Sequence, residues 1–317
     1  MTRGMIDVVY DNKAAKTALE QYALTRKNAK TNYLQLSSFD KHARVNSVQG
    51  FPEYYDVIKP QGGSKAVRLG IYSGEDESSI GEAVVRYQGV LCEYDLPPIR
   101  KQIRIDARTK RYMSQSISVI GLGSATFDQA YDGIYAIAER MSRYLEDSVL
   151  PTLDDKEYLG YRGLRASNRY FSWKGSKGTS PSVPFTKDVD PSNFLQSMLG
   201  SDFEHTKENE VIYMACTGGS DGKPSYTPKD PATFLPGDIV EVQVSFAAFQ
   251  TRDGNNKLEI LQAARIAKMK SDNDKRTHMS PIGKRKTGYE DDDTEITRKK
   301  MKGLSMADGT KDGNSGS

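Results

Sequence analysis

The sequence predicts an α+β fold in which a mainly antiparallel, curved sheet or partly open barrel packs on one long amphipathic helix, followed by a disordered C-terminal tail. Two observations lead to this prediction. Residues 240–248 alternate apolar and polar side chains with the two-residue period of a half-buried strand. Residues 126–150 carry apolar side chains at helical spacing, and Pro151 ends that pattern.

The composition is typical of a soluble globular chain. The 317 residues are 37% hydrophobic with a net charge of +3, and no run approaches the roughly 18 apolar residues of a membrane-spanning helix. We therefore expect no contact with a membrane. Cys92 and Cys216 cannot form a disulfide framework or supply a four-ligand zinc site by themselves, which indicates a reducing, intracellular compartment.

The chain is expected to divide into three segments. Residues 1–40 are an N-terminal helical segment, because alanine and leucine recur at helical spacing between 12 and 36. Residues 41–270 are the α+β domain, with two subdomains that would meet near residues 151–190. Residues 271–317 are a disordered basic tail, because apolar periodicity stops there.

The first strands of the domain are expected at residues 65–72 and 82–93, on either side of an acidic turn. They can pair as an antiparallel hairpin. A further strand is expected at 114–120, and short elements follow later: a helix starting at Pro191 and a strand at 210–216.

The strand at 114–120 leads through Gly121 and Gly123 into the long helix, whose start has capping-box spacing at Thr126 and Gln129. A dinucleotide-binding turn also joins a strand to a helix through glycines, but it needs glycine or alanine where Thr126 stands and a second parallel strand. The sequence therefore favours a tight turn that needs small residues, and it predicts no cofactor.

Residues 158–177 have the best claim to a binding function, because cations alternate there with aromatic rings that include the only tryptophan. Rings that stack on bases and cations that follow phosphates are the features that hold single-stranded nucleic acid. A second basic cluster spans 100–111. The predicted nucleic-acid-binding residues are Arg162, Arg165, Arg169, Tyr170, Phe171, Trp173, Lys174, Lys177, Arg100, Lys101, Arg104, Arg108, Lys110 and Arg111. The alternative is that Tyr170, Phe171 and Trp173 anchor a core.

The tail carries three basic clusters on a segment without apolar periodicity. Separated clusters of this kind suit the acidic groove of a nuclear-import receptor, so we expect a nuclear protein with that receptor as a second partner. The predicted localisation residues are Lys275, Arg276, Lys284, Arg285, Lys286, Arg298, Lys299 and Lys300.

Sequence patterns of catalysis are absent. None of the histidines has a second histidine or cysteine at metal-ligand spacing, and there is neither a nucleophile elbow nor a phosphate-binding loop. We predict no catalytic or metal-binding residues. An enzyme would need acidic side chains that are distant in sequence to meet at a metal ion.

The last hairpin of the domain resembles part of an OB-fold of the kind found in single-strand-binding and replication proteins. The resemblance rests on Pro236, Gly237 and Asp238, the long strand that follows them, and the turn at Asp253 and Gly254 before a second strand. It implies a small barrel and a single-stranded nucleic acid partner, but no binding residues. The long helices that precede the hairpin depart from a simple OB domain.

Together these features predict a noncatalytic protein that binds single-stranded DNA or RNA by aromatic stacking and phosphate contacts. One alternative is a nuclear structural or interaction module whose basic tail is only a localisation signal. A second is a metal-dependent enzyme. The exposure of Trp173 separates the first two: an open ring favours nucleic acid, and a packed ring favours the module. The sequence predicts no oligomeric state.

Overall fold

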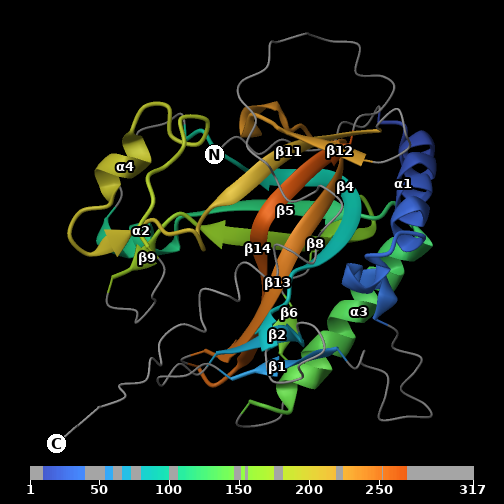
Figure 1. Cartoon of the computed structure of the whole chain (residues 1–317), viewed down its shortest axis with the longest axis horizontal. Coiled ribbons are helices and arrows are strands. Elements are labelled where there is room, and N and C mark those ends of the chain that lie inside the picture. The colour runs from blue at the N-terminus through green and yellow to red at the C-terminus, as the bar shows by residue number, and fades with distance from the viewer. Residues whose placement is uncertain are drawn as a thin grey trace, which may run out of the picture.

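The computed structural model describes residues 10–39, 54–59, 66–72, 80–99, 106–145, 151–153, 156–174, 181–218, 224–251 and 253–269 (Figure 1). Its helices are α1 (Asn12–Lys27), α2 (Ala107–Tyr112), α3 (Ala125–Ser142) and α4 (Phe194–Met198), with short 3-10 turns η1 (Asn32–Leu34), η2 (Leu36–Ser38) and η4 (Pro231–Thr233). Its strands are β1 (Tyr55–Ile58), β2 (Val67–Tyr72), β3 (Ile80–Glu82), β4 (Val85–Asp95), β5 (Ser114–Ile120), β6 (Thr152–Leu153), β7 (Lys156–Tyr158), β8 (Tyr161–Arg169), β9 (Ser172–Trp173), β10 (Phe203–Glu204), β11 (Val211–Gly218), β12 (Pro224–Pro228), β13 (Ile239–Gln250) and β14 (Asn256–Met269).

Five strands of the main sheet close into a ring. β4, β5, β8, β14 and β13 pair in that order, and β13 also pairs with β4, which completes the ring. The pairings are antiparallel except for the parallel one between β8 and β14, where Leu261 lies opposite Ser167. The predicted α+β fold with a mainly antiparallel, partly open barrel is therefore confirmed.

The hairpin of β13 and β14 is the longest paired element of the ring. Its antiparallel ladder runs from Gln250 opposite Asn256 to Val240 opposite Lys268. Gly254 in the connecting turn has φ of +81°, a value that glycine adopts without steric strain. Figure 1 shows the two long, curved strands side by side, as the sequence predicted.

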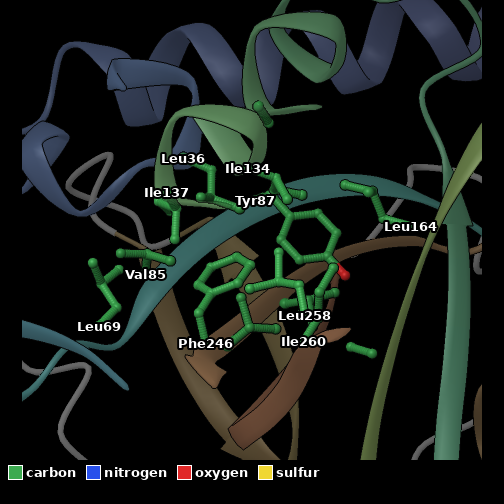
Figure 2. Packing of buried hydrophobic residues seen from close by; sticks show 14 of the residues in the cluster. Leu36, Leu69, Val85, Tyr87, Ile134, Ile137, Leu164, Phe246, Leu258 and Ile260 are labelled. Carbon is green, nitrogen blue, oxygen red and sulfur yellow. The ribbon is translucent and has the colours of Figure 1, made fainter. Parts of the chain in front are cut away.

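The core of the ring continues onto α3. Ile134 and Ile137 of the helix belong to the same buried cluster as Tyr87 of β4 and Phe246 of β13, and all four are at most 1% exposed. Figure 2 shows these side chains converging from the helix and the strands. Burying each apolar side chain of this size contributes about 1.5–3 kcal/mol. The predicted packing of the sheet on one long helix is confirmed.

The start and end of α3 differ from the prediction. Its N-cap is Ser124 instead of Thr126, and its last residue is Ser142, well before Pro151. The glycine turn before it has a steric reason, because a Cβ at Gly121 would collide with the ring of Phe127. The neighbouring strand β8 is antiparallel to β5, whereas a dinucleotide-binding turn lies between parallel strands.

The predicted hairpin of residues 65–72 and 82–93 is only partly correct. β2 pairs with the short strand β3, but β4 pairs with β13 and β5 instead of β2. The reason is the length of β13, which reaches β2 through Ala247 and Ala248 and also pairs with β4. It therefore lies between the two strands that the sequence pattern joined.

The N-terminal helix is shorter than the predicted span of 12–36. α1 ends at Lys27, its C-cap is Asn28, and the 3-10 turns η1 and η2 follow. The helix begins at an N-cap where Asp11 accepts a hydrogen bond from the backbone N–H of Ala14 at 2.9 Å. Such a cap stabilises a helix by about 0.5–2 kcal/mol.

The polar face of β13 is buried, although its alternation predicted a solvent-facing side. Glu241 is fully buried and pairs with Arg26 of α1, whose Nη2 lies 2.8 Å from its Oε1. Gln88 of β4 donates a hydrogen bond of 2.9 Å to the other carboxylate oxygen. Burial alone would raise the pKa of Glu241, but the positive charges of Arg26 and Arg86 and these hydrogen bonds hold it below its ordinary value.

The predicted disordered tail and all eight predicted localisation residues lie outside the described residues. Nuclear localisation therefore stays a prediction. Within the part of the chain that the structure describes, no helix is long and apolar enough to cross a membrane.

Candidate nucleic-acid interface

Towards Arg169, the outward-facing side chains of β5 and β8 are polar, because the strand period sends alternate side chains to opposite faces. Leu164 and Ala166 of β8 are fully buried in the ring. The positions that alternate with them include Arg165, which is partly exposed and donates a hydrogen bond from Nη2 to Ser116 Oγ of β5 at 3.3 Å. Arg169 is exposed at the end of the same strand. Two predicted cations thus share the outward side of β8.

One part of this polar surface is covered by β7. The Tyr158 hydroxyl group donates a hydrogen bond of 2.6 Å to Glu93 Oε2 and lies 3.1 Å from Ser118 Oγ. Burial and the neighbouring carboxylate raise the pKa of Tyr158 to about 12, so the hydroxyl group stays protonated at neutral pH. The exposed cation of this face, Arg169, lies at the other end of β8.

Next to the Arg169 end of β8 lies a small unit, which we call the α2–β9 lobe. It consists of α2, β9, α4, β10 and residues 181–209, and Figure 1 shows α2, β9 and α4 grouped beside the ring. Its own apolar cluster contains Tyr170, Phe171, Leu195 and Phe203. The backbone N–H of Tyr170 donates to the Met113 carbonyl at 3.0 Å, so the chain after β8 is held directly against the residue after α2.

Tyr170 and Phe171 anchor the lobe from inside. They are only 3% and 2% exposed, and the Phe171 ring centre lies 6.2 Å from that of Phe203. Burial raises the pKa of Tyr170 well above its ordinary range. Neither ring offers a free face for a base. For these two predicted binding residues the structure matches the core-anchor alternative.

Trp173 lies at the surface of the same lobe and is 45% exposed. It stands opposite Phe203 in the two-stranded ladder of β9 and β10, with ring centres 5.3 Å apart and planes at 84°. This edge-to-face contact fixes the indole while leaving much of it open. Trp173 is therefore a surface residue, whereas Tyr170 and Phe171 are core residues.

The two predicted segments meet at this lobe. Lys110 of α2 places its ammonium group 5.4 Å from the ring centre of Phe203 and also donates a hydrogen bond to the Met198 carbonyl. Arg111 and Lys174 are exposed, and neither has an ion-pair partner among the described residues. Lys110 and Arg111 of α2 and Lys174 after β9 are therefore part of the lobe that carries the exposed Trp173.

The remaining predicted residues do not lie together. Arg162 extends from the opposite side of β8 to Arg165 and lies over the ring of Tyr131 in α3, with Cζ 5.2 Å from the ring centre. It is therefore separated from the lobe. Arg108 is part of α2. Arg100, Lys101, Arg104 and Lys177 lie outside the described residues.

Tyr112 and Phe203 are aromatic residues of the lobe that were not among the predicted site residues. Tyr112 is 61% exposed, and Arg169 lies over its ring with Cζ 5.9 Å from the centre. The signal for Tyr112 was present in the sequence, because the ring directly follows Lys110 and Arg111. Phe203, which contacts Trp173, has no comparable signal in the sequence, because it lies thirty residues after Trp173.

Groups with metal-ligand chemistry are scattered over the described ranges. No set of three or more histidine, cysteine, aspartate or glutamate side chains there is close enough to hold a metal ion. Cys92 and Cys216 are buried free thiols, and burial raises the pKa of each, to about 12 and about 11.

Comparisons with known proteins gave a similarity in structure but none in sequence family. No protein-family model and no curated protein matches the chain. Among solved structures, the chain is similar to gp2.5, a single-stranded DNA binding protein encoded by bacteriophage T7. That match has 8% sequence identity and a TM-score of 0.30, and it covers 63% of this chain and 89% of the phage protein.

Proposed function

We propose that this chain binds single-stranded DNA or RNA at the α2–β9 lobe without catalysing a reaction. The observation that carries the proposal is the exposed Trp173, fixed edge-to-face on Phe203 in a lobe that also carries the exposed cations Arg111 and Lys174. Stacking on such a ring contributes about 1–3 kcal/mol per base, and every base has a face that can stack. The cations supply the attraction to phosphate.

The strand order of the ring supports this placement. In chain order the ring strands are β4, β5, β8, β13 and β14. OB-folds bind oligonucleotides on the face of their second and third strands and at the loops between strands one and two and between strands four and five. Here the second and third strands are β5 and β8, and β8 carries Arg165 and Arg169. The helix α2 lies in the connection between the first and second strands.

The test is fluorescence anisotropy of labelled oligonucleotides titrated with the full chain at low salt. We expect single strands to bind more tightly than a duplex of the same sequence, because paired bases are not available for stacking. Trp173→Ala should weaken single-strand binding by about 5- to 150-fold, the equivalent of one stacked base. The loss should be similar for strands of different sequence.

The matched control is Tyr135→Ala. Tyr135 is 37% exposed on α3, so it resembles Trp173 in ring exposure but lies away from the lobe. Its removal should leave binding within about twofold, as expected for a surface change away from the site. Equal affinity of the wild type and Trp173→Ala would remove Trp173 from the binding site.

The basic tail needs its own control, because lysine and arginine clusters attract phosphate without a folded site. A full-length variant with Lys284→Gln, Arg285→Gln and Lys286→Gln should retain the preference for single strands. If the preference disappears with these charges, or if the wild type binds no oligonucleotide, the exposed indole belongs instead to a contact with another protein.

A further inference from the structure

Tyr112 is the most exposed large apolar side chain among the described residues of the lobe, at 61%. A single exposed tyrosine is ordinary on a protein surface. This one differs because a cation covers it: the Arg169 guanidinium carbon lies 5.9 Å from the ring centre. A guanidinium over one face of a ring leaves the opposite face for another planar group. The ring is thus arranged like one half of a stacking site.

A backbone hydrogen bond holds the Tyr112 side chain in place relative to β8 of the barrel. Tyr112 ends α2, and the next residue, Met113, accepts the hydrogen bond from the N–H of Tyr170 at 3.0 Å. Tyr170 in turn follows Arg169, so the arginine and the tyrosine approach each other from two segments joined by that bond. The contact between Arg169 and Tyr112 is therefore held by the backbone of the two segments.

The same short helix also contacts the support of Trp173. Lys110, two residues before Tyr112, places its ammonium group 5.4 Å from the ring centre of Phe203. Phe203 is the ring on which the Trp173 indole stands. α2 therefore connects the two exposed aromatic side chains of the lobe, one through Lys110 and one through its own last residue.

We propose that Tyr112 is a second base-stacking residue and that the lobe binds at least two unpaired bases of one strand, one on Trp173 and one on Tyr112. Arg169 acts as a positioning residue that holds the Tyr112 ring. This inference rests on the proposed function and narrows its ligand to an unpaired run of two or more nucleotides. Stacking of this kind tolerates any base, because each has an open π-face.

The first test compares Tyr112→Ala with Tyr112→Phe, which keeps the ring and removes only the hydroxyl group. With a labelled single strand, Tyr112→Ala should reduce the affinity by about 5- to 150-fold, and Tyr112→Phe should stay much closer to the wild type. Saturating oligonucleotide should still quench Trp173 fluorescence in Tyr112→Ala, because the other stacking position is intact. Equal affinity of Tyr112→Ala and the wild type would overturn the inference.

Two outcomes distinguish this inference from the proposed function. If Trp173→Ala weakens binding and Tyr112→Ala does not, the lobe has one stacking position and the proposed function stands. If neither substitution changes binding, the proposed function itself is wrong. Independent positions also predict that the double variant is weakened by about the product of the two single factors, as separate sites usually are.

The role of Arg169 is tested by a double-mutant cycle. Arg169→Gln should weaken binding in the wild-type background, but its effect should be much smaller when Tyr112 is already alanine, because there is no ring left to position. Thermal unfolding of each variant reports the fold separately from affinity. If Arg169→Gln weakens binding equally in both backgrounds, Arg169 contacts phosphate and does not position the ring.

Discussion

Arg26 and Arg169 each place a guanidinium over a tyrosine ring, yet the surroundings of the two pairs are opposite. Arg26 lies over Tyr22, is 7% exposed and forms a buried ion pair with Glu241. Arg169 lies over Tyr112 at the surface and has no ion-pair partner among the described residues. The first pair has its charge neutralised inside the protein, while the second presents its charge and an open ring outward.

The difference shows why residue type alone does not identify a binding site. An arginine beside an aromatic ring stabilises the fold where its counter-charge is built in, as at Arg26. Where no counter-charge is built in, as at Arg169, the guanidinium and the ring beneath it stay at the surface. The burial and pairing of each cation therefore carry the functional distinction.

The largest expected effect is on the buried pair. Glu241→Gln should lower the free energy of unfolding by about 3–5 kcal/mol, because it leaves the Arg26 guanidinium buried without its counter-charge. Urea unfolding followed by far-ultraviolet circular dichroism measures this destabilisation. The control is Glu82→Gln, which breaks the exposed 2.7 Å pair with Arg68 and should change stability by about 0–1 kcal/mol. Similar destabilisation in both variants would contradict the distinction between buried and exposed pairs.

A smaller effect is expected from pH within the lobe. Burial lowers the pKa of His205 below its ordinary 6.5, while its Nδ1 lies 2.9 Å from the Tyr170 carbonyl oxygen. A depressed folded-state pKa means that the stability contributed by neutral His205 is present above the unfolded value and is lost as the pH falls through the folded one. As the pH is lowered from neutral towards the folded-state pKa of His205, the lobe should therefore unfold at a lower urea concentration. The fluorescence of Trp173, the only tryptophan, measures this unfolding.

His205→Asn is the control for this pH dependence, because asparagine keeps a polar nitrogen near the carbonyl oxygen but does not titrate. Its lobe should show little pH dependence in the same window. A wild-type lobe whose unfolding does not change with pH would show that His205 is not held neutral by its surroundings.

The smallest effect on stability is expected at the exposed cations. Arg111→Gln combined with Lys174→Gln should change the free energy of unfolding by no more than about 0.5 kcal/mol, since neither side chain is buried. The salt dependence of single-strand binding should nevertheless fall by roughly 0.7 in log–log slope for each phosphate that the variant no longer neutralises. An unchanged slope would mean that the strand passes elsewhere on the molecule.

Local patterns predicted several elements of this fold correctly. The turn at Asp253 and Gly254 and the alternation before it predicted the β13–β14 hairpin, and an apolar stripe predicted α3. Closure of the ring could not be predicted in this way. The pairing of Ile239 with Val90, for example, joins positions that share no local signal. Glu241 looked solvent-facing because its partner, Arg26, lies 215 positions away.

The candidate site was predictable in composition but not in geometry. Sequence spacing placed Tyr170, Phe171 and Trp173 together, and the structure separates them into two buried rings and one exposed ring. The strand period fails there because the consecutive residues Tyr170 and Phe171 lie between β8 and β9, and both point into the lobe core. Tyr112 becomes a candidate only when Arg169 is seen above it.

The central position of β13 also affects how the chain is made. β13 pairs with β2, β4 and β14, so β4 lacks one neighbour until about 150 more residues have been synthesised. At roughly 5–20 residues per second, that interval lasts on the order of 10 s. During this time the nascent sheet exposes backbone groups that can pair with other chains. Protection at the ribosome therefore matters most before residue 239 emerges.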